Sequence, residues 1–422
     1  MIKKAFLHYL WKFKKFDTLD LVSVHKEQIS IIDLGSYLES ENPIFFNAQL
    51  VINHQKWAGN VLMYPKSSDI TVLENALDPS LQSTILYVVW LHDLASCTKE
   101  NSEIPILELQ TYVNPEIVSS YQLLMTPKSW IYCQKDLKNS SNWARTDWLE
   151  KLFLERLEQK TATIRALLAT TRNDWEAVLF CLVAKNFGLN INGSLFYQIA
   201  QSIPFTILRK ESNAPENLEA LLFGFAGLLD SENQDGYFAD LKFRYFYLLH
   251  KYQLEPPTLE PVQYAKLRPD NFPNIRLSQL ANLYSNQHNL FSKIIELDTL
   301  EFAYTLFDVA VSPYWKTHYG FGKESSFKPK KISKSFVDLL VINTIIPFQF
   351  AYRSSLGQDA SRESISLMRK ISPEKNSVVT KFVAFGMTAA DALDSQSLLQ
   401  LKKEYCLKSK CLDCAIGVAV LQ

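Results

Sequence analysis

The chain of 422 residues carries 44 lysine and arginine residues and 44 aspartate and glutamate residues, so its formal net charge is zero. This balance excludes the global positive field with which non-specific nucleic-acid-binding proteins attract phosphates, and any nucleic-acid contact would have to be local. The length and the apolar content of 47% predict a soluble protein of two domains. Six cysteines in so long a chain do not make a disulfide framework and indicate a reducing, cytoplasmic compartment.

The N-terminal segment from Met1 to Lys15 places apolar side chains at helical spacing, which predicts an amphipathic helix packed on the first domain. It lacks the small-residue cleavage site of a signal peptide. The apolar runs Leu218–Leu229 and Phe336–Phe350 are too short or are interrupted by polar residues and proline. We therefore expect no membrane-spanning segment and no membrane partner.

Residues 1–145 carry strand signals, in which apolar or aromatic residues alternate with small or polar ones. The expected strands are Ile29–Leu34, Phe45–Ile52, Lys56–Tyr64, Thr84–His92 and Ile104–Leu109. The pattern predicts a small mixed sheet with few helices, centred on the stretch from Pro43 to Asp93.

From Trp148 onward the apolar residues recur at intervals of three and four, which indicates helices to the end of the chain. Within this region Asn173 and Asn192 are expected to cap two helices. The fold class is therefore α+β, with a small mixed β-sheet N-terminal domain followed by a large all-helical C-terminal domain. We place the domains at residues 1–145 and 146–422, and the proline-rich segment 255–261 is a linker that would divide the second.

Three cysteines near the C-terminus have the spacing C-x4-C-x2-C, which can present thiolates to one zinc ion or one iron–sulfur cluster. They are Cys406, Cys411 and Cys414, and Cys133 is the best distant candidate for a fourth ligand. The alternative is that these are unrelated cysteines on a terminal helix.

Two arginines flank a short segment in which prolines fix an extended turn before a helix. Arg268 and Arg276 are candidate binding residues, since together they could clamp a carboxylate or a phosphate. The alternative is a structural role, in which both arginines pair with acidic neighbours or with the carboxyl ends of helices. The chain has no glycine-rich phosphate loop, no HExxH and no G-x-S-x-G motif, and its seven histidines show no ligand spacing.

Several short motifs are distributed over the whole chain. They are Phe6–Lys12, Phe45–Ala48, Trp57–Val61, Lys66–Asp69, Asn173–Ala177, Arg268–Pro269, Asn271–Pro273, Ile275–Ala281 and the three C-terminal cysteines. Together they resemble an uncharacterised bacterial family, that of domain of unknown function 2851. The resemblance implies an architecture without a reaction or a known partner.

The stretch from Pro43 to Asp93 departs from the pattern of these relatives at its polar positions. Ile44 stands in place of an aspartate, Leu62 of a glutamate, Tyr64 and Tyr87 of histidines and Ile70 of a tryptophan, while Leu73–Asn75 falls where the pattern has His-x-His. Of the polar set, Lys66 and Asp69 remain.

The family pattern of an acid after proline, then an acid and a basic residue on the next strand, is similar to that of restriction-endonuclease-like nucleases. In that chemistry two carboxylates hold a divalent metal that activates water. Ile44 and Leu62 cannot bind Mg²⁺, which implies a catalytically degenerate member that acts in binding or scaffolding.

Two alternatives to this degenerate protein stay open. One is a nucleic-acid-processing or other hydrolase whose site is rebuilt at Lys66 and Asp69, where Glu74, Asp78 or Asp93 would complete a carboxylate cluster. The other is an enzyme whose site lies elsewhere, at the two arginines or at a metal held by the cysteines.

Overall fold

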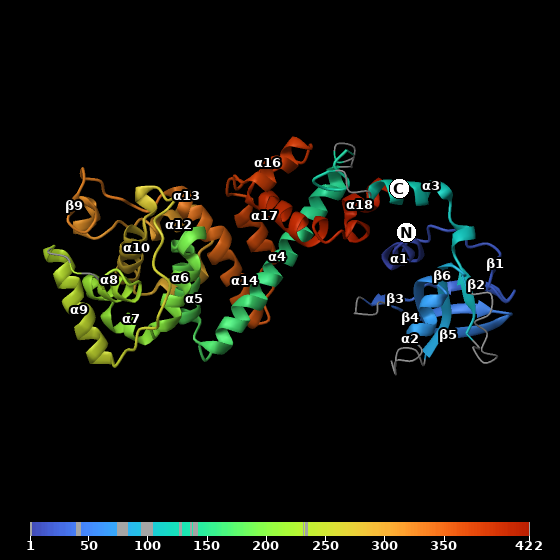
Figure 1. The fold of residues 1–422 in the computed structure, drawn as a ribbon, viewed down its shortest axis with the longest axis horizontal. Coiled ribbons are helices and arrows are strands. Elements are labelled where there is room, and N and C mark those ends of the chain that lie inside the picture. Colours follow the sequence, from blue (N-terminus) through green and yellow to red (C-terminus); the bar gives the residue numbers. More distant parts are fainter. Residues whose placement is uncertain are drawn as a thin grey trace. The chain divides into compact units, whose positions relative to one another are not determined.

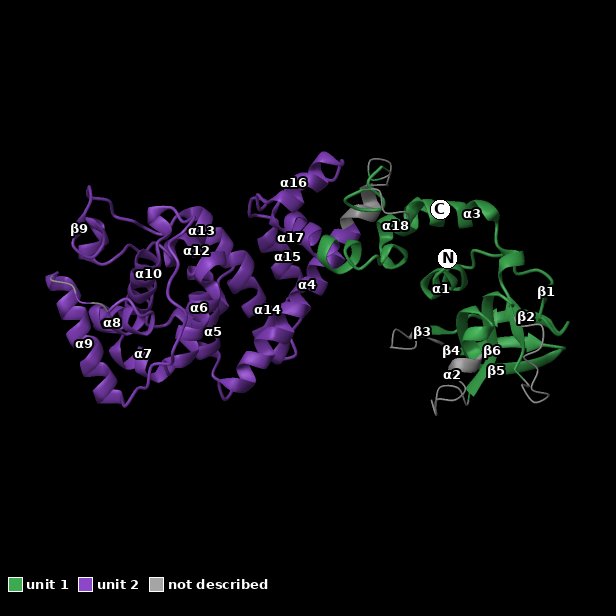
Figure 2. Ribbon diagram, viewed as in Figure 1, with its two compact units in different colours: residues 1–145, 402–422 green, residues 146–401 purple. Residues whose placement is uncertain are grey.

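The computed structural model describes residues 2–38, 44–73, 83–93, 104–125, 129–135, 137, 142–230, 232 and 235–421. The chain forms two compact units, which are coloured separately in Figure 2. Unit 1 consists of residues 1–145 and 402–422, and unit 2 of residues 146–401. The α+β class is confirmed, but the C-terminal segment, which was expected to belong to the helical domain, returns to unit 1 at Lys402.

Unit 1 is built on one mixed sheet (Figure 1). Its strands are β1 (Leu21–Val22), β2 (Gln28–Asp33), β3 (Ser36–Leu38), β4 (Ile44–Ile52), β5 (Gln55–Lys66), β6 (Thr84–Leu91) and β7 (Ile106–Glu108). The order is β1-β2-β4-β5-β6-β7, with β3 beside β4. The pairs from β1 to β5 are antiparallel, whereas β5, β6 and β7 are parallel, so the carboxyl ends of β5 and β6 lie at the same edge.

The helices of unit 1 are short. They are α1 (Lys4–Lys12), α2 (Ser68–Leu73), η2 (Gln110–Tyr112), α3 (Pro115–Leu124), η8 (Cys411–Asp413) and α18 (Ala415–Val420), and the π-helical segment η7 (Leu401–Cys406) enters the unit from unit 2. The expected N-terminal helix is present as α1, and its apolar residues from Phe6 to Trp11 are buried. Phe6 stacks on Tyr121 of α3 with ring centroids 4.0 Å apart, which holds α1 and α3 together.

Unit 2 is a helical array with one small hairpin. Its elements are α4 (Asn142–Thr170, which begins in unit 1), α5 (Trp175–Phe187), α6 (Leu189–Ser202), α7 (Phe205–Glu211), α8 (Pro215–Phe225), α9 (Gly236–Tyr252), η4 (Pro269–Asn271), α10 (Pro273–Asn286), α11 (Leu290–Glu296), α12 (Leu300–Leu306), η5 (Pro313–Lys316), β8 (His318–Gly320), β9 (Lys323–Glu324), α13 (Lys334–Leu340), η6 (Val341–Ile345), α14 (Ile346–Ser355), α15 (Ser361–Met368), α16 (Ser377–Ala384) and α17 (Ala392–Gln400). The proline-rich segment 255–261 lies without regular structure between α9 and η4.

The two predicted caps in this region are wrong. Asp174, not Asn173, caps α5, because its carboxylate accepts the backbone N–H of Ala177 at 3.0 Å. Asn192 lies inside α6 and instead exchanges hydrogen bonds with the backbone of Gln263 at 2.8 and 2.9 Å.

The helical run Lys334–Ser355 is long and apolar enough to cross a membrane, by length and composition alone. The prediction that this stretch was too short is therefore corrected. The π-helical segment η6 carries the helix past Asn343, and Pro347 is tolerated because it falls in the first turn of α14. Within the run, 67% of the apolar window is buried inside the protein, as in the core helix of a soluble protein.

Candidate functional site

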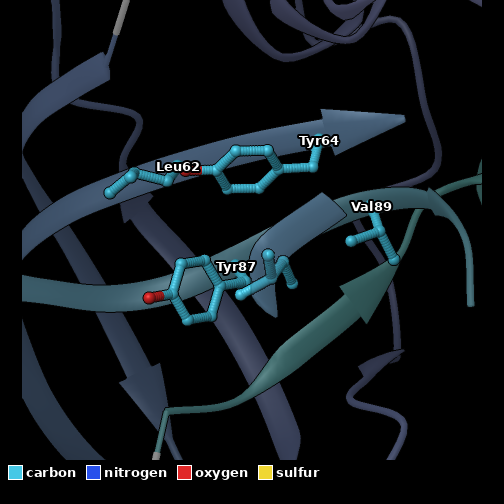
Figure 3. Close-up of a cluster of buried hydrophobic side chains, with 5 residues drawn as sticks. Leu62, Tyr64, Tyr87 and Val89 are labelled. Atoms are coloured by element: carbon cyan, nitrogen blue, oxygen red, sulfur yellow. The ribbon is translucent and has the colours of Figure 1, made fainter. Parts of the chain in front are cut away.

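Four of the positions at which the chain differs from the pattern implied by the resemblance, Leu62, Tyr64, Ile70 and Tyr87, lie in one apolar cluster together with Val89. Leu62 pairs with Tyr87 and Tyr64 with Val89 in the parallel ladder of β5 and β6, so their side chains share a face of the sheet. Ile70 of α2 completes the cluster, and all five residues are at most 6% exposed. Figure 3 shows the four strand residues lying side by side on the two strands.

The side chain of Leu62 cannot take part in a metal site. Phe45 of β4 pairs with Val61 of β5, so the two strands run side by side next to Leu62. A divalent cation such as Mg²⁺ needs oxygen ligands, whereas Leu62 offers only hydrocarbon. The side chain of Ile44 lies outside the described part of the chain.

Tyr64 and Tyr87 contact each other at the side of the cluster that faces helix α1. The rings of Tyr64 and Tyr87 lie 6.2 Å apart at 55°, a tilted aromatic contact. The amine of Lys4 in α1 sits 4.8 Å from the centre of the Tyr64 ring, and burial lowers the pKa of this lysine. The cluster is therefore closely packed and shielded from solvent, whereas a hydrolytic site would need access for water.

Lys66 and Asp69 lie next to this cluster, at the edge where β5 and β6 end. The carboxylate of Asp69 accepts the backbone N–H of Lys66 at 3.1 Å and so closes the turn into α2. Asp93, which follows β6, converges on the same turn, and its carboxylate lies 3.5 Å from the Lys66 amine. Glu74 and Asp78, the other expected acids, lie outside the described residues.

Asp93 is engaged as an anchor of the turn. One of its oxygens accepts the Ser67 hydroxyl at 3.1 Å and the Ser68 N–H at 3.0 Å, and the other accepts the Ser68 hydroxyl at 2.9 Å. Partial desolvation raises the pKa of Asp93, but the hydrogen bonds from Ser68, Ser67 and Lys66 outweigh it and lower the pKa to about 2. The arrangement ties β5 to β6 and leaves Lys66 paired and half exposed.

Arg268 and Arg276, the two predicted clamp residues, lie in different environments. Arg268 is exposed at the start of η4, whereas Arg276 of α10 is 6% exposed. Arg276 donates to the side-chain oxygens of Gln279 at 2.9 Å and Asn271 at 2.6 Å, and its guanidinium lies 3.8 Å from the centre of the Phe336 ring. Burial lowers the pKa of Arg276 to about 10, with Asp270 opposing the shift. For Arg276, two amide oxygens and an aromatic face thus take the place of the expected acidic partner.

A buried carboxylate that sequence reasoning missed lies in α8. Glu219 is fully buried and accepts the hydroxyl of Tyr237 at 2.9 Å and that of Ser278 at 3.0 Å, together with hydrogen bonds from Ser312 and Trp315. Burial raises the pKa of Glu219, and the four donors oppose that shift. The signal was visible as one acid inside the apolar run Leu218–Leu229.

All four candidate metal cysteines lie in unit 1. Lys402, where the tail begins, donates to the backbone oxygen of Trp130 at 2.7 Å, which ties the tail to the segment that carries Cys133. Burial raises the pKa of Cys406, and the thiols of Cys414, Cys133 and Cys411 raise it further, so the four lie within electrostatic range.

The four thiols do not yet form a ligand set. Burial, and then Cys414, raises the pKa of Cys411 to about 12, so this thiol is protonated at neutral pH. Among the described residues, no group of three or more His, Cys, Asp or Glu side chains is arranged to hold a metal ion. Binding of a metal would therefore have to displace the protons of the thiols.

A family model described as "Protein of unknown function (DUF2851)" matches residues 4–377 of this chain. The matched range contains the apolar cluster, the turn from Lys66 to Asp69 and both arginines, and it ends before the C-terminal cysteines. Comparison with curated proteins and with solved structures gives no match.

Proposed function

Because this chain belongs to the DUF2851 family, whose description assigns no activity, we propose its function from the site itself. It is a non-catalytic member of the family, in which a nuclease-like N-terminal domain has lost its metal-binding acids. The protein acts by binding, or as a scaffold, through its helical unit.

The apolar cluster of Leu62, Tyr64, Ile70, Tyr87 and Val89 is the observation that carries this proposal. A divalent metal that activates water needs several oxygen ligands and a route for the water. The cluster supplies packed hydrocarbon and aromatic rings at positions where the family pattern has an acid and histidines. The substituted side chains pack against one another and leave no space for water between them. This packing is typical of a former site that has become part of the hydrophobic core.

Exposed aromatic side chains on one face of α9 support the binding role. Phe243, Phe246 and Tyr247 follow one another at helical spacing and are 74%, 56% and 56% exposed. Large apolar side chains gathered on an open surface are typical of interaction sites.

The proposal is tested by incubating the full-length protein with DNA and RNA in Mg²⁺ or Mn²⁺. We expect no cleavage, because Lys66 cannot generate a nucleophile without a metal. The rebuilt hydrolase is the competing reading, since Asp93 does reach Lys66. Against it, the serine donors already engage both oxygens of Asp93.

The cysteines give a second candidate function, which is a metal centre in unit 1. The location of Cys133 in the same compact unit as the three C-terminal cysteines favours it, because four cysteines are the complement that zinc or an iron–sulfur cluster requires. On this proposal, anaerobically purified protein carries zinc or iron in near-equal molar amount, measured by elemental analysis.

A matched pair of cysteine variants makes the metal test specific. Cys406→Ser should lose the metal, whereas Cys181→Ser, at a buried thiol of α5 in unit 2, should keep it. Protein that contains neither iron nor zinc would remove the metal centre from consideration.

A further inference from the structure

Unit 2 contains a cavity of about 960 Å³. It is bounded by α4, α5, the π-helical segment η6, the loop that precedes α16, and α17. Its volume lies at the upper end of the range in which proteins bind small molecules. No motif in the sequence pointed to it, because its walls come from segments more than 200 residues apart.

Basic side chains from two helices line this cavity. Arg156 and Lys160 project from α4, and the exposed Lys185 projects from α5. Arg156 donates its Nε–H to the side-chain oxygen of Gln396 at 2.7 Å, a neutral partner that itself donates to Glu374. Arg156 is thus positioned by an amide.

The acids of the cavity wall are partly engaged elsewhere. Asp338 accepts the hydroxyl of Tyr304 at 2.7 Å, and Glu374 accepts the amide of Gln396. With Lys375 counted, four basic residues face two acids on the lining, so the cavity carries an excess of positive charge. Such an excess in a concave surface attracts anions.

Lys160 has little compensation for its positive charge. Its amine donates to the side-chain oxygen of Asn343 at 3.2 Å, and within the described part of the chain it forms no ion pair. An ammonium has three donors, so most of its hydrogen-bonding capacity is left for a ligand. Asn343 lies in η6, and single π-helical turns are frequent at functional sites.

The electrostatics of Lys160 agree with this geometry. Burial, together with the charges of Arg156 and Lys185 and against the opposing charge of Glu374, lowers its pKa to about 7. An anion placed among the three basic groups would offset the repulsion between Lys160 and its neighbours Arg156 and Lys185.

We propose that this cavity binds a small organic phosphate through Arg156, Lys160 and Lys185. Phosphate suits the set, because a guanidinium offers a fork of donors to its oxygens and the lysines add point charges. This inference goes beyond the proposed function, since it gives unit 2 a ligand class and is independent of any chemistry in unit 1.

Binding is predicted to depend on pH with a defined sign. The anion favours the charged form of Lys160, so complex formation takes up a proton and raises the pKa of the amine. For a phosphate of fixed charge, affinity is therefore highest below about pH 7 and falls as the pH rises above that value, after the protonation of the phosphate itself, measured separately, has been subtracted.

The test is calorimetric titration of the full-length protein with pyrophosphate, as a minimal probe of phosphate binding. Wild type should bind, and Lys160→Met should lose at least about tenfold in affinity, the effect of one charge-assisted contact. Lys185→Ala removes an exposed side chain, so it keeps the fold and should also weaken binding. Lys151→Met is the matched control on α4, since Lys151 lies over the Trp148 ring outside the cavity, and it should bind as wild type does.

A chemical readout complements the titration. Acetylation with limiting acetic anhydride at pH 7.5, followed by mass spectrometry, should modify Lys160 faster than Lys151, and pyrophosphate should protect Lys160. The proposal is overturned if wild type does not bind pyrophosphate, if Lys160→Met and Lys185→Ala both bind as wild type does, or if citrate binds and pyrophosphate does not.

Discussion

The Leu62→Glu variant, which restores the acid of the family pattern, is expected to lose about 3–5 kcal/mol of stability and to gain no nuclease activity. Leu62 is 3% exposed and packs with Tyr64 and Tyr87. A carboxylate there would lose its hydration and the apolar contacts of leucine, and it would gain no metal. The Lys4 amine lies over the Tyr64 ring and would have to leave that ring to pair with the new carboxylate.

The control for this variant is Leu62→Met, which nearly conserves the side-chain volume. It should lower the free energy of unfolding by less than about 1.5 kcal/mol. Chemical unfolding gives the free energies, and hydrogen exchange of the β5 amides locates the loss in unit 1. The introduced carboxyl should titrate with a raised pKa, so the deficit relative to wild type should be smaller at low pH than at pH 8. A Leu62→Glu protein as stable as wild type would contradict the apolar account of the cluster.

Replacement of Glu219 should show the second large effect. Glu219→Leu is expected to destabilise unit 2 by about 3–5 kcal/mol, because the hydroxyls of Tyr237, Ser278 and Ser312 and the indole N–H of Trp315 lose their common acceptor. Glu219→Gln should be nearly neutral at pH 7. Its amide oxygen can serve Tyr237 and Trp315, while its NH₂ group donates to the two serine hydroxyls, which can accept.

The pH dependence separates the charge of Glu219 from its packing. Burial raises the pKa of this carboxyl above its ordinary value of 4.5, so the folded state holds the proton more tightly than the unfolded state. Its contribution to stability is therefore greatest below 4.5 and is lost as the pH rises through the raised pKa. The free energy of unfolding of wild type should fall relative to that of Glu219→Gln over this window, and parallel pH profiles would contradict the assignment.

The sequence predicted the sheet well where its signal was local. The alternation in Phe45–Ile52 and Lys56–Tyr64 spans enough residues to define a strand, and both strands are present with ends extended by one or two residues. Strands β1 and β3 have two and three residues, which is too short for a period of two to be recognised.

The candidate site could be identified only from the three-dimensional structure. The unusual residues at 62 and 87 could be identified separately in the sequence, but only the parallel pairing of β5 with β6 places them side by side. The surroundings of Glu219 also required the fold, because its partners lie as far along the chain as Trp315. The partners of Arg276 could not be predicted either, because they are uncharged amides, and a sequence indicates ion pairs only through charged residues. Local spacing specifies elements, whereas register and long-range packing specify sites.

Cleavage of nucleic acid tests the central claim of a vacated metal site most directly. Full-length protein would be incubated with single-stranded DNA, double-stranded DNA and RNA in Mg²⁺ or Mn²⁺, beside the variants Lys66→Ala, Asp69→Ala and, as a control at an exposed lysine of β5, Lys56→Ala. The account predicts no metal-dependent cleavage by any of these proteins. Metal-dependent hydrolysis by wild type that survives in Lys56→Ala and disappears in Lys66→Ala or Asp69→Ala would contradict it.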